Sequence, residues 1–520
     1  MENLWEKELC EGSTSYVDIF DDIKTESVSS GHGLSKNDLI STQLREKGNQ
    51  KFKDSLWIDA MDYYNKSLRF AAIGTKNMSF VYANRAACFL HLKMFDKCLI
   101  DIEMAKEGNY PKELLPKLEK READCLKMMK REKQEHLLER KLSFEANANF
   151  PCLANVVEIQ WNDEFGRHVI AKCDLPAGKT ILVEKSFLST TLSGPFIGCA
   201  TCQRTTMNFI ACDHSMMSLL DSTIAVFCDD HCKQAGLHKY DCNFVYDRNQ
   251  ANDSQLRMMA QTIFFGMDAM ENIDEMIQFV EETERIKSSW TPDSIVDAKS
   301  KYRLFLTLAA FPDENEKKSL VVKAKSLYGI LIGIPTVNGV FNTTEKQQFL
   351  KHLVTKHVVI ASQNAINATQ NQCQRIATLG LIFPLFNHEC APNLLNFSIG
   401  DQQVCITMRP VKKGGQLFVS YVTADVSTRL RQTHLMNNFG FLCKCDKCEL
   451  KSSTLAAKKL LADPLYLFLQ RNRKVDLLND TIRANIKEKC IDLLNKHGQT
   501  WFPELEFVVD LYVKSELYEH

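Results

Sequence analysis

Asn387-His388-Glu389-Cys390-Ala391-Pro392-Asn393 is the most informative stretch of this sequence. Further along the chain, the segment from Gly414 to Tyr421 combines two glycines with an apolar strand that ends in Ser-Tyr. The segment from Phe439 to Cys448 then places three thiols in a Cys-x-Cys-x-x-Cys pattern. Any one of these motifs is weak alone, but their assembly in this order is improbable by chance.

Composition limits the classes of protein to consider. The 520 residues are enough for about three or four domains, and the formal net charge of -1 gives no global electrostatic argument for binding nucleic acid or an anionic membrane. The N-terminus lacks a signal pattern, and no uncharged apolar run is long enough to span a bilayer. Nineteen cysteines without an export signal favour thiolate metal sites over disulfides, so we expect a protein of the nucleus and cytoplasm.

The three motifs together resemble the SET-domain protein lysine methyltransferases. The resemblance implies that Asn387 and His388 contact S-adenosylmethionine within a pseudoknot, and that Phe441 lies against this cofactor. It also implies a post-SET zinc site with four thiolate ligands: Cys390, Cys443, Cys445 and Cys448. The pattern supports this site independently, because Cys-x-Cys-x-x-Cys leaves a closed structural zinc one ligand short.

The implied reaction is attack of a lysine ε-amine on the methyl group of the sulfonium cofactor. The amine must be neutral, so an apolar channel that disfavours the ammonium form would help, and positioning would carry much of the rate. Tyr421 is the predicted catalytic residue and also a cofactor contact; the alternative is a strand-end aromatic in a core. Phe439 stands where many family members have a second channel Tyr, and Phe165 where some have a basic residue, so both departures could slow turnover.

The N-terminal part of the chain has two sections. Residues 1–37 are acidic and Ser-rich and predict a flexible arm. Residues 38–140 carry an amphipathic helical repeat that resembles tetratricopeptide repeats, for which a helical stack without a ligand is the default interpretation. The second copy aligns Phe95, Cys98 and Ala105 with members of the first copy, which comprises Leu44, Gly48, Asn49, Phe52, Trp57, Ala60, Tyr64 and Ser67.

Two amides and three cations are expected to converge on the concave face of these repeats: Arg45, Asn49, Asn84, Lys117 and Arg121. Such a set suits a terminal carboxylate together with an acidic side chain. It resembles the carboxylate clamp of repeat domains that bind the acidic C-terminal tails of heat-shock chaperones, with Arg45 standing where the family usually has Lys. The alternative is a charged, solvated surface.

A split, β-rich domain is expected to follow. Within 151–198, residues 165–171 and 174–183 predict a β-hairpin whose turn is Pro-Ala-Gly at 176–178. This segment resembles the N-terminal half of a SET domain, in which a Gly-x-Gly-like turn approaches the cofactor. The resemblance implies cofactor contacts from Gly166, Arg167 and His168.

The cysteine-rich module at 199–242 resembles a MYND finger, and its spacings suit two tetrahedral zinc sites that would supply folding energy. The first site would use Cys199, Cys202, Cys228 and Cys232. The second site would use three ligands, Cys212, His238 and Cys242, and one further group. Ser215 stands where a second Cys is expected, so either His214 substitutes or this site is weak or empty, and the chain would hold two or three zinc ions.

The remaining segments complete the expected architecture. Residues 243–370 predict a helical insertion, in which Asn364 is placed like the insertion's cofactor-contacting Asn. The catalytic SET core at 371–423 and the post-SET segment at 434–450 follow. Residues 451–520 predict a short helical region, with helices at 455–469, 475–494 and 504–513.

Together these features predict an α+β multidomain protein that resembles the SET and MYND domain-containing lysine methyltransferases with N-terminal tetratricopeptide repeats. The resemblance implies histone or non-histone protein lysines as substrates, a role in transcriptional regulation, and a MYND finger that binds a corepressor or histone deacetylase. The main alternative is a catalytically weak or inactive adaptor that links chaperones to corepressors. A zinc-dependent DNA-binding protein is disfavoured by the neutral charge and the lack of a basic recognition helix.

Overall fold

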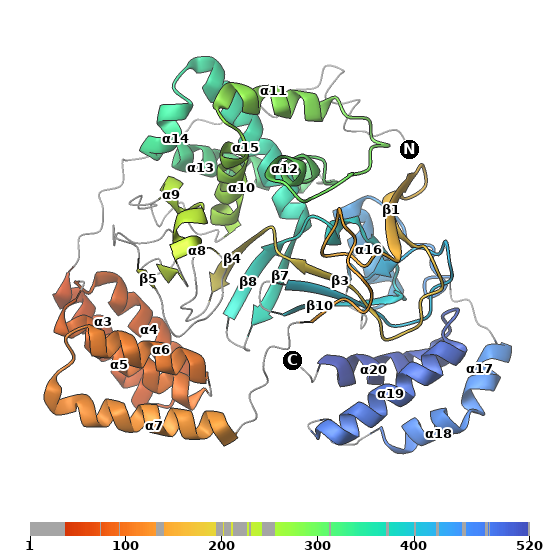
Figure 1. Cartoon of the computed structure of the whole chain (residues 1–520), viewed down its shortest axis with the longest axis horizontal. Coiled ribbons are helices and arrows are strands. Elements are labelled where there is room, and N and C mark those ends of the chain that lie inside the picture. Colours follow the sequence, from red (N-terminus) through yellow and green to blue (C-terminus); the bar gives the residue numbers. More distant parts are fainter. Residues whose placement is uncertain are drawn as a thin grey trace.

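Groups of helices surround a central set of strands in the computed structural model (Figure 1). With the exception of residues 73 and 93, the structure describes residues 37–131, 140–193, 201, 210–211, 226–227, 230–241, 255–310, 314–370, 374–399, 402–422, 426–449, 454–473, 477 and 479–517. The predicted arm, apart from Asn37, lies outside these residues. None of the described helices is long and apolar enough to cross a membrane.

Two helix pairs and a further helix form the N-terminal region. Along the chain these are α3 (Asp38–Lys53), α4 (Trp57–Phe70), α5 (Lys76–His91), α6 (Phe95–Glu107), the short η1 (Lys112–Leu114) and α7 (Leu115–Arg131). Trp57 opens α4 and Phe95 opens α6, while Ala60 and Cys98 are both fully buried. The repeat positions predicted from the sequence therefore occupy equivalent places in the two helix pairs.

Close packing between α3 and α4 depends on Gly48. A Cβ atom at this position would lie 2.6 Å from the Tyr64 ring, so only glycine lets the two helices approach this closely. Deeper in the region, the fully buried Arg85 guanidinium binds Asp101 through two hydrogen bonds of 2.8 and 2.9 Å and also donates to Asn65 Oδ1. This network joins α4, α5 and α6 through one buried cation.

Short strands make up the centre of the molecule. They are β1 (Val157–Asn162), β2 (Gly166–Ala171), β3 (Thr180–Lys185), β4 (Leu188–Ser193), β7 (Ala365–Gln370), β8 (Gln374–Leu379), β9 (Asn387–His388), β10 (Leu394–Ile399), β11 (Gln402–Thr407) and β12 (Phe418–Val419), with η2 (Phe383–Leu385) before β9. Strand β11 lies between β10 and β3, and β8 lies between β4 and β7, all antiparallel. Strands β1 and β2 form an antiparallel hairpin, whereas β9 and β12 pair in parallel.

The predicted hairpin between residues 165–171 and 174–183 is wrong. Strand β2 folds back on β1 instead, because a tight turn precedes it. The Asn162 side chain accepts hydrogen bonds from the backbone N–H groups of Glu164 and Phe165, at 3.1 and 2.7 Å, and Gly166 has a φ of 63°. These features complete the reversal of the chain direction at the start of β2.

The Pro-Ala-Gly turn at 176–178 has a different role. Its Ala177 N–H donates to the Asn495 side chain at 2.7 Å, and its Gly178 N–H donates to the backbone oxygen of Thr407 at 2.6 Å. The turn thus directs β3 to pair with β11 and fixes this edge of the strands to the C-terminal helices.

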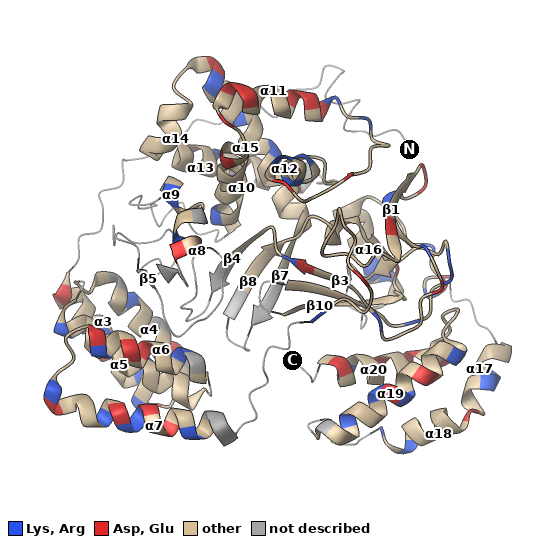
Figure 2. Ribbon diagram, in the orientation of Figure 1, with Lys and Arg blue, Asp and Glu red and all other residues tan. Residues whose placement is uncertain are grey.

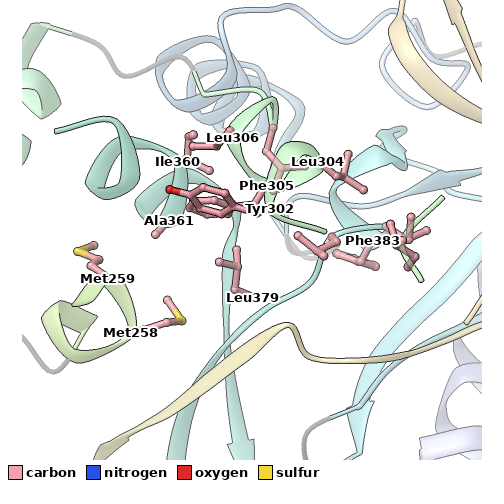
Figure 3. Packing of buried hydrophobic residues seen from close by; sticks show 14 of the residues in the cluster. Met258, Met259, Tyr302, Leu304, Phe305, Leu306, Ile360, Ala361, Leu379 and Phe383 are labelled. Atoms are coloured by element: carbon pink, nitrogen blue, oxygen red, sulfur yellow. The ribbon is translucent and has the colours of Figure 1, made fainter. Parts of the chain in front are cut away.

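After the cysteine-rich module, the described part of the insertion that precedes β7 consists of α10 (Gln255–Ala269), α11 (Ile273–Glu284), α12 (Ala298–Leu306), α13 (Glu314–Gly333), α14 (Pro335–Val340) and α15 (Thr344–Asn364). Figure 3 shows Tyr302 and Phe305 of α12 beside Ile360 and Ala361 of α15, with Leu379 of β8 nearby. All five are almost fully buried, so the insertion and the strands share one hydrophobic core.

A buried polar network crosses the insertion. The Thr262 hydroxyl donates to the backbone oxygen of Met259 and therefore accepts from Nδ1 of His357, 2.7 Å away. Nε2 of His357 then accepts from the Tyr302 hydroxyl at 3.0 Å. Burial lowers the pKa of His357 well below its usual value, so this histidine is neutral in the folded protein.

Four short elements are described in the cysteine-rich module: β5 (Ile210–Ala211), β6 (Val226–Phe227), α8 (Asp230–Ala235) and α9 (His238–Asp241). Strands β5 and β6 pair in antiparallel fashion. Of the predicted zinc ligands, Cys232 lies on α8 and His238 opens α9. The other predicted ligands lie outside the described residues: Cys199, Cys202, Cys212, His214, Cys228 and Cys242.

Helix α16 (Thr428–Phe439) precedes the last cysteines, and the C-terminal helices are α17 (Thr454–Leu461), α18 (Pro464–Arg471), α19 (Asp480–His497) and α20 (Glu506–Leu517), with η3 (Pro503–Leu505). The single helix predicted for 455–469 is therefore wrong. It is divided at Asp463, whose side chain caps α18 by accepting from the Leu465 N–H at 2.9 Å, with Pro464 at the first helical position.

Candidate active site and metal centre

The centre of the site is the parallel pairing of β9 with β12. Phe418 lies opposite Asn387 and Val419 opposite His388, and the Glu389 N–H extends the pairing by donating to Val419 O at 3.0 Å. Two of the three predicted motifs therefore lie side by side. Tyr421, two residues beyond β12, is brought directly against the Asn387-His388 element.

Tyr421 is fixed at both ends. Its hydroxyl donates to the backbone oxygen of Phe386 at 2.7 Å, and its backbone N–H donates to Nδ1 of His388 at 2.9 Å. The Phe439 ring lies 4.7 Å from the Tyr421 ring, measured between centroids. Burial raises the pKa of Tyr421 above its usual value, so its side chain is a neutral phenol that both donates and accepts hydrogen bonds.

Asn387 connects this centre to the β1–β2 hairpin. Its side-chain amide donates to the backbone oxygen of Phe165 at 3.1 Å and to that of Arg167 at 3.5 Å. The predicted residues Gly166 and Asn387 therefore meet at the turn of the hairpin. A Cβ on Gly166 would contact no atom within 4 Å, so the turn needs glycine for its positive φ and not for space.

The side chains of Arg167 and His168 are bound by groups of the protein. Arg167 donates to the Thr307 hydroxyl at 3.1 Å and to the Thr307 backbone oxygen, just beyond α12. Burial lowers the pKa of Arg167 to about 10, so the guanidinium stays charged at neutral pH. Nδ1 of His168 lies 2.9 Å from the backbone oxygen of Gly166. The predicted cofactor contacts of these two residues stay predictions.

Asn364, at the end of α15, is held near the same region. Its amide donates to the backbone oxygens of Ala309 and Ile360, both at 2.9 Å. Ala309 lies two residues beyond Thr307, the partner of Arg167. The segment after α12 thus connects Asn364 to the hairpin that carries Gly166, and the predicted cofactor contact of Asn364 stays a prediction.

Four thiols lie close together next to His388, where the sequence predicts a zinc site. The sulfur atoms of Cys390, Cys443, Cys445 and Cys448 all lie within 4.8 Å of one another, and those of Cys390 and Cys448 are 3.5 Å apart. A tetrahedral zinc with Zn–S bonds of about 2.3 Å requires sulfur separations of about 3.8 Å. Both the donor set and its spacing therefore fit a structural zinc ion.

The thiols also share hydrogen bonds. The bond from Cys390 lowers the pKa of Cys445 below its usual value, whereas the bond with Cys443 raises the pKa of Cys390. The four thiols thus cannot ionise independently. A bound cation would stabilise the additional thiolates and remove this competition.

Helix α16 supports the thiol cluster. The Gln432 side chain binds both backbone groups of Cys443, donating to its carbonyl at 2.6 Å and accepting from its N–H at 2.9 Å. The almost fully buried Arg431 directs its guanidinium toward the Cys448 sulfur at 3.9 Å, and Leu435 packs against Cys390 and Cys443. Gln432 and Arg431 were not predicted, since their spacing carries no motif.

Three further positioning residues were not recognised in the sequence. Asn393, inside the first motif, accepts from the Phe418 N–H at 2.8 Å and donates to the Gln416 carbonyl at 2.9 Å. Arg409 donates to the backbone oxygens of Ala391 and Pro392 in the same loop. Glu184 of β3 accepts hydrogen bonds from the backbone N–H groups of residues 381–383, shortly before Asn387. Of these three residues, only Asn393 could have been recognised in the sequence, because it is the last residue of the motif that begins at Asn387.

Four of the five predicted peptide-binding residues surround Tyr64 in the N-terminal helices. Asn49 accepts from Tyr64 at 2.9 Å and from Asn84 at 2.8 Å. Burial raises the pKa of Tyr64 above its usual value, while the positive charges of Arg45 and Arg121 act in the opposite direction. Arg121 also donates to the backbone oxygen of Ala83. Lys117 lies one turn before Arg121 on α7, a helix that carries both basic and acidic residues (Figure 2).

Comparisons with known proteins agree with this geometry. The family model described as the SET domain matches residues 166–422. Over 146 residues, or 28% of this chain and 18% of the relative, the chain is 33% identical to protein-lysine N-methyltransferase SMYD4 of Pongo abelii. Over 341 residues, or 58% of this chain and 83% of the relative, it is 22% identical to a SET and MYND domain-containing protein of Dictyostelium discoideum.

A shorter match is histone-lysine N-methyltransferase SET5 of Saccharomyces cerevisiae, 37% identical over 70 residues, which is 13% of each protein. The chain spans only 18% of the length of the SMYD4 relatives of Pongo abelii and Homo sapiens that it matches. The region that the SET-domain family model matches nevertheless includes Gly166 of the hairpin turn, the β9–β12 pairing and Tyr421. The chain contains a SET domain and is similar to proteins that combine a SET domain with a MYND-type zinc finger.

Proposed function

We propose that this chain is an S-adenosylmethionine-dependent protein-lysine N-methyltransferase. The observation that carries the proposal is the position of Tyr421, a partly buried residue whose hydroxyl lies 2.7 Å from the backbone oxygen of Phe386, immediately before Asn387. The Tyr421 hydroxyl and the Phe386 carbonyl thus place two oxygen atoms next to each other. Such a pair suits the placement of a lysine amine and a polarised methyl group, in a SET domain whose relatives include named lysine methyltransferases.

The chemistry of the site agrees with this reaction. The attacking amine must lose its proton, and a desolvated channel lowers the pKa of a lysine. The rings of Tyr421 and Phe439 supply apolar walls, and the raised pKa of Tyr421 prevents a phenolate that would favour the ammonium form. When bound, S-adenosylmethionine supplies the electrophilic methyl group. Gly166 and Asn387, which meet at the hairpin turn, are the residues we expect beside it.

A methyl-transfer assay tests this proposal. Wild type should transfer label from the cofactor to proteins of a lysate or array, and Tyr421→Phe, which removes one oxygen atom, should lose most of the transfer. Tyr466→Phe is the matched control, since Tyr466 is buried among the C-terminal helices. Absence of transfer by wild type, despite measurable cofactor binding, would contradict the proposal.

A second candidate function is peptide binding by the N-terminal helices, which we propose to be tetratricopeptide repeats. The grouping of Arg45, Asn49, Asn84 and Arg121 around Tyr64 favours it. The proposed ligand is an acidic C-terminal tail of a heat-shock chaperone. We expect binding of a free-acid acidic peptide by wild type, weaker binding of its C-terminal amide, and loss of both in Arg121→Ala.

The expectations about the cysteine-rich module, the localisation and the substrates extend the proposal of a lysine methyltransferase. A MYND finger at 199–242 would bind zinc and a corepressor or histone deacetylase, and a protein in both nucleus and cytoplasm would methylate histone or non-histone lysines in transcriptional regulation. A catalytically weak adaptor is the alternative, favoured by Phe439, which lacks a second channel hydroxyl beside Tyr421. Phe439→Tyr distinguishes the two, because a gain of transfer would identify a slowed enzyme.

A further inference from the structure

Both ring nitrogens of His388 bind groups of the protein. Nδ1 accepts the backbone N–H of Tyr421 at 2.9 Å, and Nε2 lies 3.1 Å from the sulfur of Cys390. A backbone N–H can only donate, so Nδ1 must be the unprotonated nitrogen. The ring proton of the neutral imidazole therefore resides on Nε2 and points at the Cys390 sulfur.

This arrangement forms a continuous chain of two hydrogen bonds. It runs from Cys390, one of the four thiols, through the imidazole to the backbone of Tyr421. A metal-bound thiolate is a stronger acceptor than a thiol, so metal binding strengthens the bond that His388 donates. Polarisation along the chain then strengthens the bond that His388 accepts from Tyr421.

The surroundings of His388 hold its ring in place. His388 is 7% exposed and its backbone pairs with Val419. Its ring packs near those of Tyr421 and Phe441, with centroids 5.3 and 6.1 Å away. The ring is thus confined between the thiol cluster and the strand that ends at Tyr421.

We propose that His388 is a positioning residue that couples occupancy of the four-thiol metal site to the placement of Tyr421. The proposal rests on the proposed function, in which Tyr421 orients the substrate amine. It gives the imidazole a role other than cofactor contact. The metal site would then do more than fix the chain after α16, since Tyr421 reaches its working position only when Cys390 is a bound thiolate.

The test uses the full chain labelled with 15N-tyrosine and needs no substrate. The Tyr421 amide signal is assigned by its loss in Tyr421→Phe, and spectra are compared with zinc, with cadmium and after metal removal. We expect the Tyr421 signal of wild type to shift with each change of metal state. In His388→Phe, which keeps a ring but no ring nitrogen, the four thiols should still hold metal while the Tyr421 signal stops responding.

Cys390→Ala provides a second variant that keeps the imidazole and removes its acceptor. Its Tyr421 signal should also stop responding to metal, and the Tyr466 signal serves as an internal reference in every sample. A Tyr421 signal that responds equally in wild type, His388→Phe and Cys390→Ala, or that responds in none of them, overturns the proposal. Because the readout is independent of methyl transfer, an inactive protein with a responsive Tyr421 signal would contradict only the proposed function.

Discussion

A Cβ atom built on Gly380 would lie 2.6 Å from Oε2 of Glu184, so this buried carboxylate and the backbone ahead of Asn387 are in direct contact. Glu184 accepts three successive backbone N–H groups, from Leu381, Ile382 and Phe383, at 2.7 to 2.8 Å. Burial raises the pKa of Glu184, while these three donors act in the opposite direction. One side chain of β3 thus holds the segment that leads into β9.

Gly380→Ala should therefore destabilise the protein by about 1–3 kcal/mol, the usual cost of overpacking. The added methyl group must displace the carboxylate from its three donors or shift the backbone before Asn387. Urea unfolding followed by tryptophan fluorescence measures the loss. Gly339→Ala is the matched control, because a Cβ there meets no atom within 4 Å and alanine favours the helix α14. Equal stability of the two variants would contradict the role of Glu184.

The sequence was sufficient where function depends on residues grouped in short motifs. The Asn387-His388 element, the strand ending at Tyr421 and the four thiols were all predicted, and the structure brings them together. Each motif lies within one strand or loop, so the parallel pairing of β9 with β12 is enough to bring the motifs together. The helix pairs of the N-terminal region were predictable for the same reason, since their positions repeat.

Contacts between segments far apart in sequence were not predictable. Glu184 binds residues about two hundred positions later, and no local pattern distinguishes it from any acidic residue on a strand. The wrong hairpin has the same origin. Both β2 and β3 have strong strand propensity, but their partners are decided by the Asn162 turn on one side and by β11 on the other. Strand propensity does not specify pairing.

The buried ion pair of the N-terminal helices should be essential to their stability. Asp101→Ala leaves the fully buried Arg85 guanidinium without its acidic partner, which typically costs about 3–5 kcal/mol. Hydrogen exchange of α5 and α6 measures this local loss. Asp59→Ala breaks the exposed pair with Lys51 and should cost less than about 1 kcal/mol. Similar exchange rates in the two variants would show that burial of the pair is unimportant.

Metal affinity at the four thiols should depend on Gln432. Gln432→Ala removes both hydrogen bonds to the Cys443 backbone, and loss of such support typically weakens metal binding about 10- to 100-fold. Protection of Cys443 and Cys445 from alkylation during chelator titration, followed by mass spectrometry, reports on this site alone. Asn438→Ala is the control on the same helix, since that side chain donates to its own helix at His434 O. Unchanged protection in Gln432→Ala would refute the prediction.

Acidification should destabilise the insertion through His357. Its pKa is lowered by burial, so the folded protein excludes a proton that the unfolded chain binds below the ordinary histidine pKa of about 6.5. Stability is therefore greatest above this pH and falls as the pH decreases through it, with a slope of up to about 1.4 kcal/mol per pH unit. His357→Gln should be less stable than wild type at pH 7.5, because its contacts with Thr262 and Tyr302 change, but its stability should decrease less steeply between pH 7.5 and 5.5.

Urea unfolding across this pH range measures how steeply the stability of wild type and of His357→Gln depends on pH. His434→Gln, at an exposed position, is the control and should retain the wild-type slope. Parallel slopes for wild type and His357→Gln would mean that other groups carry the pH dependence of this protein.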